Sequence, residues 1–243
     1  GEAVGQWLGM PPLTGSYAFS IVAQTLALTL YLVALRPDPL KIAQRIARTR
    51  DAGTQRIVEV DRPIVARYAV FAVAGSHVTM ASVMAMTPVH LSHLDPRNVT
   101  TIVGVTIALH VFGMYGLSPV FGILADRWGR LQTILLGQAI LAASLVTAAI
   151  APNSPTAVLI ALLLLGLGWS AATVGGAALL TEATPTELRP RRQGRSDTAM
   201  TLSAAIGSVL AGGILGLIGY GGLALVALAV VIAITVLSPY ARR

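Results

Sequence analysis

Apolar stretches close to the length of a membrane-spanning helix follow one another along nearly the whole chain. A helix needs about 20 mostly apolar residues to cross the hydrocarbon core of a bilayer. Seven such stretches are present, at 16–35, 67–90, 99–121, 131–151, 156–180, 196–218 and 222–238. Strands of a transmembrane barrel would alternate apolar and polar positions over about ten residues, which this sequence does not do. The pattern predicts an all-α integral membrane protein with seven transmembrane helices.

Glycines and other small residues indicate how the last two stretches are arranged. The sequence Gly219, Tyr220, Gly221, Gly222 joins them, and this turn-forming sequence predicts an antiparallel helix hairpin. Small residues precede the turn at four-residue spacing, in two rows: Ser203, Gly207 and Ala211, and Ser208, Gly212 and Gly216. Such rows allow helices to approach closely, so we expect both rows to be packing surfaces.

The composition indicates lipid as the surrounding solvent. Charged residues make up 11% of the 243 residues, and the mean hydropathy is +0.74. Soluble domains usually carry about a quarter charged residues. The net charge of +7 does not indicate nucleic-acid binding, because only 5% of the residues are aromatic and the basic residues cluster between the apolar stretches. The chain has no cysteine, which excludes disulfides, thiolate metal sites and thiol nucleophiles.

Lysine and arginine are distributed very unevenly between the connections. All but one of the 17, Arg97, lie in or beside the segment 36–66, the connections after the third and fifth stretches, and the C-terminal tail. Basic residues accumulate in cytoplasmic loops, which predicts an external N-terminus and a cytoplasmic C-terminus. The segment 36–66 is the one long connection, and it is either an amphipathic helix on anionic headgroups or a solvated linker. In both cases it marks a domain boundary.

The connection after the third stretch contains the most specific pattern in the chain. Within nine residues it places Gly122, Asp126, Arg127, Gly129 and Arg130. This spacing matches Gly-x-x-x-Asp-Arg-x-Gly-Arg, the signature of the major facilitator superfamily of transporters. The segments 84–90 and 193–197 are similar to those of its bacterial drug-efflux-like members. The chain therefore resembles this family over essentially its whole length.

The resemblance implies a division of the chain and a location. The family has two six-helix halves, so the seven stretches correspond to helices six to twelve. Residues 1–35 would be an outer loop and the last helix of the first half, 36–66 a basic cytoplasmic linker, and 67–243 the C-terminal bundle. A multi-pass protein of the bacterial inner membrane is expected. Transport would require the missing helices one to five or an equivalent half.

Seven membrane spans are also compatible with other classes of protein, and one of these classes can be excluded. The chain could be a fragment of a longer transporter, a half-transporter subunit, or a non-transporting receptor or scaffold. A retinal protein needs a lysine in its last helix, and the only lysine is Lys41. No nucleophile–base pair or metal cluster is recognisable in the spans, so we expect neither an enzyme nor a metal or cofactor site.

The signature residues are expected to form a conformational latch. Gly122 and Gly129 would allow a close helix approach and a tight turn. Asp126 would pair with an arginine or a helix N-terminus, while Arg127 and Arg130 would bridge the cytoplasmic seam between the two halves. By resemblance, Asp197 at the start of the sixth stretch belongs to the same latch. Such contacts would have to break during alternating access.

Six further residues are candidates for a substrate and proton pathway. His77 and His110 are the only histidines well inside spans, where ionisable residues are costly and often functional. Met80 and Met84 share a face with His77 and would line an adaptable apolar cavity. Trp169 and Thr173 lie in the middle of the fifth stretch. We therefore expect proton-gradient-driven efflux of small amphipathic compounds, with the lipid bilayer and the substrate as partners.

Overall fold

The computed structural model describes residues 15–34 and 60–242, together with Gly5, Trp7, Gly9 and Ile42. The chain divides into two compact units, Gly1–Val58 and Glu59–Arg243. In the first unit the helix α2 (Gly15–Ala34) coincides within one residue with the first predicted stretch. Most of the predicted linker lies outside the described residues, and from Pro63 onward its end is already helical.

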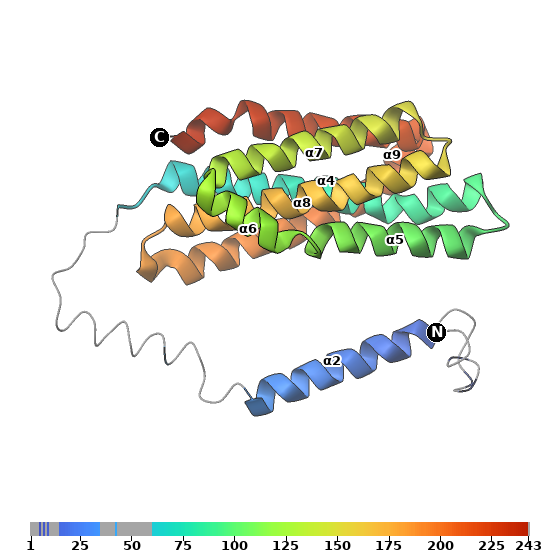
Figure 1. Cartoon of the computed structure of the whole chain (residues 1–243), viewed down its shortest axis with the longest axis horizontal. Coiled ribbons are helices and arrows are strands. Elements are labelled where there is room, and N and C mark those ends of the chain that lie inside the picture. Colours follow the sequence, from blue (N-terminus) through green and yellow to red (C-terminus); the bar gives the residue numbers. More distant parts are fainter. Residues whose placement is uncertain are drawn as a thin grey trace. The chain divides into compact units, whose positions relative to one another are not determined.

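The second unit is a bundle of long helices (Figure 1). Within the described residues every regular element is a helix and no strand occurs. The helices are α4 (Pro63–Leu94), α5 (Val99–Tyr115), α6 (Ser118–Arg127), α7 (Arg130–Ile150), α8 (Pro155–Glu182), η1 (Thr186–Leu188), α9 (Arg189–Val236) and η2 (Ser238–Arg242). The predicted all-α fold is confirmed.

In the part of the chain that the structure describes, five helical segments are long and apolar enough to cross a membrane, by length and composition. The last of them contains two predicted stretches, because the backbone leaves the helical region at Gly219, with φ 72° and ψ −179°. The chain reverses there, and the second part of α9 returns toward the end at which α9 begins (Figure 1). This is the predicted hairpin, and it brings the spans of the second unit to six.

The third predicted stretch is not one continuous helix. It ends as α5 at Tyr115, and α6 begins at Ser118 after Gly116 and Leu117. Pro119 has no backbone N–H and its ring crowds the carbonyl four residues earlier, so it interrupts the helix one turn before itself. Gly122, Asp126 and Arg127 lie on α6 rather than in a loop.

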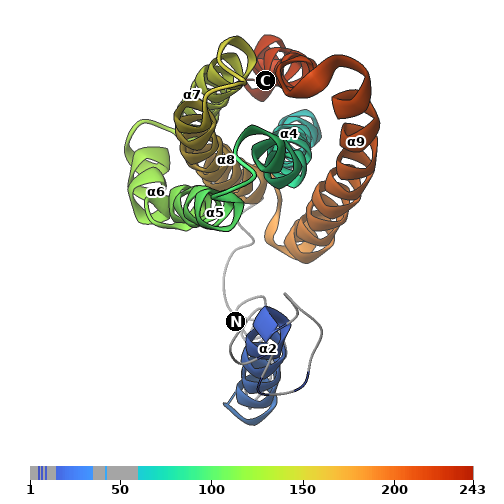
Figure 2. The ribbon, with the colours of Figure 1, turned by 90° about the vertical axis from the view of Figure 1, so that its right-hand side faces the viewer.

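The bundle is arranged around α4. In an end view α4 lies among α8, α7 and the two parts of α9, while α5 and α6 lie along α8 (Figure 2). The surface of the bundle is strongly apolar, and the residues Leu217, Val209 and Ile150 are 86%, 79% and 78% exposed. Side chains of this kind are expected where lipid surrounds the protein.

Glycines position the helices at close range. A Cβ on Gly113 would lie 2.7 Å from the carbonyl oxygen of Leu163, and one on Gly166 would collide with the carbonyl oxygen of His110, so α5 and α8 are in backbone contact. The predicted row of Ser203, Gly207 and Ala211 does pack against α4. The other row meets α4 only in part: Ser208 donates to the carbonyl oxygen of Ala81 at 3.5 Å and a Cβ on Gly212 would lie 3.9 Å from the Met86 sulfur, whereas a Cβ on Gly216 would meet no atom within 4 Å.

Candidate functional site

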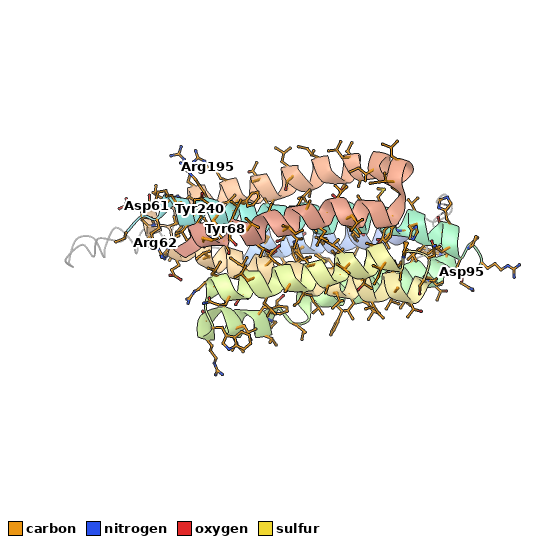
Figure 3. The ribbon with its side chains drawn as sticks, turned by 90° about the horizontal axis from the view of Figure 1, so that it is seen from above. Asp61, Arg62, Tyr68, Asp95, Arg195 and Tyr240 are labelled. Carbon is orange, nitrogen blue, oxygen red and sulfur yellow. The ribbon has the colours of Figure 1, made fainter. Side chains whose placement is uncertain are left out.

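Charged residues gather at one end of the bundle, which we call the arginine end. It comprises the residues before α4, the junction of α6 with α7, and the start of α9. Figure 3 shows Asp61, Arg62 and Arg195 at this end and Asp95 at the opposite end. The predicted signature therefore meets the N-terminus of α4 and the beginning of α9 at one end of the molecule.

Four of these residues form the Glu182 network: Arg62, Asp126, Arg130 and Glu182. Glu182, the last residue of α8, accepts a hydrogen bond from Nη2 of Arg62 at 2.9 Å. Its other carboxylate oxygen lies 3.1 Å from Nε of Arg130, and Nη2 of Arg130 lies 3.5 Å from Oδ1 of Asp126. The network thus connects the starts of α4 and α7 with the ends of α6 and α8.

A second ion pair lies beside this network. Arg192 in the first turn of α9 donates to both oxygens of Asp61, at 2.6 and 2.8 Å, and to Oγ1 of Thr184 at 3.3 Å. The hydrogen bonds from Arg192 hold the pKa of Asp61 below its ordinary value. The backbone is tied at the same place, since Arg62 N–H donates to the carbonyl oxygen of Ala183 at 3.1 Å.

The signature residues divide into three groups in the structure. Asp126 and Arg130 belong to the Glu182 network, whereas Arg127 and Asp197 are exposed and form no ion pair with another described residue. Gly129 precedes α7 with φ 109° and ψ 154°, a conformation essentially restricted to glycine. Gly122 lies on α6, where an added Cβ would meet no atom within 4 Å, so the expected close helix approach is not made within the described residues.

The middle of the bundle brings several pathway candidates together. Trp169 on α8 donates from Nε1 to Nδ1 of His77 on α4, at 2.9 Å, and the ring centroids are 5.7 Å apart. Tyr115, at the end of α5, meets Trp169 edge to face at 6.2 Å. Met80 is buried in the same core as Trp169, and Met84 packs against that core. We call His77, Tyr115 and Trp169 the aromatic cluster.

The other two pathway candidates have buried polar atoms without a partner. His110 is fully buried, and its Nδ1–H donates to the carbonyl oxygen of Leu162 on α8 at 2.8 Å. Its Nε2 atom therefore carries a lone pair, and it has no hydrogen-bond partner among the described residues. Oγ1 of Thr106, one turn earlier on α5, and Oγ1 of Thr173 on α8 are also buried without a hydrogen-bond partner among the described residues.

Sequence reasoning did not identify Glu182, Arg62, Asp61, Arg192 or Tyr115. One signal for Glu182 was present, because it is the only acidic residue between Asp126 and Glu187 and it ends a span on the same predicted side as the signature. Its partners are separated from it by up to 120 residues. The pairing itself therefore depends on how the helices pack.

Comparison with known proteins places this arrangement in a family. The family model described as Major Facilitator Superfamily matches residues 69–242. Two proteins of Bacillus subtilis (strain 168), Uncharacterized MFS-type transporter YddS and Uncharacterized MFS-type transporter YdeG, are each 34% identical to the chain, over 213 and 228 residues. These alignments cover 84% and 90% of the chain but 48% and 52% of the relatives, so the chain spans about half of their length. The chain belongs to the major facilitator superfamily and is a multi-pass membrane protein of a transporter family.

Proposed function

We propose that this chain is the C-terminal part of a secondary transporter that exports small amphipathic molecules in exchange for protons. Alternating access requires a second bundle around a central site, supplied by helices one to five with α2 or by an equivalent half. The observation that carries the proposal is the Glu182 network, because a machine of this kind needs contacts at its ends that can open and close.

The strength of the network suits a reversible latch. Its ion pairs are partly exposed, with 36% of the Arg130 side chain and 46% of the Glu182 side chain accessible. Exposed ion pairs contribute only about 0–1 kcal/mol each, so they can break during each cycle without unfolding the bundle. By the distribution of basic residues, the arginine end faces the cytoplasm. The latch would then control access from the cytoplasmic side.

The interior of the bundle supports an amphipathic cargo. In the described spans every Asp, Glu, Lys and Arg lies near a helix end, for example Glu182 at the last position of α8. The middle of the bundle presents the aromatic cluster with Met80 and Met84. Aromatic and methionine side chains bind apolar molecules of varied shape, while His77 and His110 are the groups there that can carry a proton.

Flux measurements test this proposal. The complete protein, including any segment that precedes Gly1, is reconstituted in vesicles, and a fluorescent amphipathic dye is followed with and without an imposed pH gradient. We expect the gradient to drive dye movement, and we expect the His77→Ala, His110→Ala double variant to lose that dependence. His93→Ala is the control, because His93 is exposed at the Asp95 end. Gradient-independent flux in the unmodified protein would rule out proton coupling.

A further inference from the structure

We propose that a proton on His77 and the hydrogen bond from Trp169 exclude each other, so that this pair is a proton-operated switch inside the bundle. The inference deepens the proposed proton coupling and rests on it for its role in transport. It starts from one contact, the 2.9 Å hydrogen bond between Nε1 of Trp169 and Nδ1 of His77.

The chemistry of the two rings fixes the protonation state of His77. An indole N–H can only donate, so Nδ1 of His77 must supply a lone pair. His77 is therefore neutral in this structure, with its proton on Nε2. A second proton would have to bind at Nδ1, and the imidazolium would then present an N–H to the indole N–H. The hydrogen bond cannot survive that change.

Among the described side chains, the charged groups of the helices packed against α4 lie near helix ends, whereas His77 lies near the middle of α4. On α7 and α8 the charged residues are Arg130 and Glu182, at the terminal positions. Glu182 lies 13 residues from Trp169, or about 20 Å along the helix. On α5 the ionisable side chains are Tyr115 and His110, and His110 is bonded to Leu162. On α9 and η2 the described ionisable side chains lie toward the ends of the bundle: Arg189, Arg191, Arg192, Arg195, Asp197, Tyr220 and Tyr240.

Loss of the Trp169–His77 hydrogen bond would alter contacts among three helices. Its indole belongs to α8, is hydrogen-bonded to α4, and meets Tyr115 of α5 edge to face. It is 9% exposed and packs in the main core with Met80. A buried indole N–H that loses its acceptor is costly, so the ring must turn toward a new acceptor. That movement changes the seam between α4, α5 and α8.

Proton binding at His77 and the conformation of the bundle are thermodynamically linked through this hydrogen bond. A bundle conformation that keeps the Trp169 bond binds a proton at His77 less tightly than one in which the bond is broken. A neutral hydrogen bond of this kind corresponds to a difference of about two- to tenfold in proton affinity. Protonation and the rearrangement of the seam would therefore favour each other.

The experiment observes Trp169 directly. The complete protein is labelled with 5-fluorotryptophan and studied by ¹⁹F NMR in detergent between about pH 8 and pH 5, the interval in which histidine usually titrates. Trp169→Phe identifies the resonance. We expect the chemical shift of this resonance to change with pH along a titration curve for the binding of one proton. In His77→Asn, whose side-chain oxygen keeps an acceptor but does not titrate, it should stay at its high-pH position. In His77→Phe it should stay away from that position at every pH.

A control variant and the dye-flux assay distinguish failure of the switch from failure of the proposed coupling. His93→Asn, at the exposed end of α4, should leave the Trp169 titration unchanged. A Trp169 resonance that ignores pH, or that still titrates in His77→Asn, would overturn the switch even if dye flux follows the pH gradient. Conversely, a Trp169 titration that depends on His77 supports the switch even where gradient-independent flux has removed the proposed coupling.

Discussion

Arg192 donates two hydrogen bonds to the carboxylate of Asp61, from Nη1 at 2.6 Å and from Nη2 at 2.8 Å, across 131 residues of chain. This fork-to-carboxylate geometry is the most specific form of an arginine ion pair. It fastens the residues before α4 to the first turn of α9. The N-terminus of α4 is therefore held by the helix that forms the last hairpin of the bundle.

The Asp61–Arg192 pair predicts an acid-sensitive part of the stability. Because Arg192 holds the pKa of Asp61 below its ordinary value, the pair contributes above the unfolded pKa of about 4. The contribution is lost as pH falls through the lower folded-state pKa. We expect Asp61→Asn to lower the Tm in detergent at neutral pH, and the difference from the unmodified protein to vanish in acid. Equal Tm values at neutral pH would contradict this assignment.

The two signature glycines should respond differently to alanine. Gly129 has φ 109° and ψ 154°, and an added Cβ would lie 2.5 Å from Oε1 of Gln132. Backbone strain of this kind costs about 1–3 kcal/mol. We expect Gly129→Ala to destabilise the bundle by that amount in unfolding measurements in detergent. Gly122→Ala is the matched control, because a Cβ there meets nothing within 4 Å. Equal losses from both substitutions would refute the backbone explanation for Gly129.

Contact between α5 and α8 should depend on Gly166. An alanine there would press its Cβ against the carbonyl oxygen of His110, and overpacking of this kind costs about 1–3 kcal/mol. We expect Gly166→Ala to separate the two helices, weaken the His110–Leu162 hydrogen bond and lower the Tm. Gly213→Ala, on an open part of α9, should leave the Tm unchanged or raise it. If Gly166→Ala melts like this control, the two helices do not depend on a glycine at their contact.

The sequence was sufficient to predict the spans, the hairpin and the family. Spans are set by local composition and length, and the hairpin by a run of glycines whose first member, Gly219, adopts a positive φ. The break between α5 and α6 was missed, because a proline inside an apolar stretch sometimes leaves a helix continuous. Pro88 lies within the unbroken α4, whereas Pro119 begins a new helix.

Pairings within the candidate site were harder to predict than the fold. Trp169 and His77 are 92 residues apart, and Glu182 and Arg62 are 120 residues apart. Each residue lies on a helix whose existence is predictable, but its partner depends on the rotation and depth of a second helix. Hydropathy sets neither quantity, because close packing at residues such as Gly166 sets both.

The most direct test of the latch is the accessibility of the arginine end. Gln132 lines a cavity of about 330 Å³ together with Arg62, Arg130 and Glu182. In the complete protein a single cysteine is placed at Gln132, and its labelling rate by a membrane-impermeant maleimide is measured with and without Glu182→Gln. Asp197→Asn, which removes an exposed acidic charge at the same end that forms no ion pair with another described residue, is the control. We predict labelling a few-fold faster in Glu182→Gln than in the control. Equal rates in the three proteins would show that the Glu182 network does not hold this end closed.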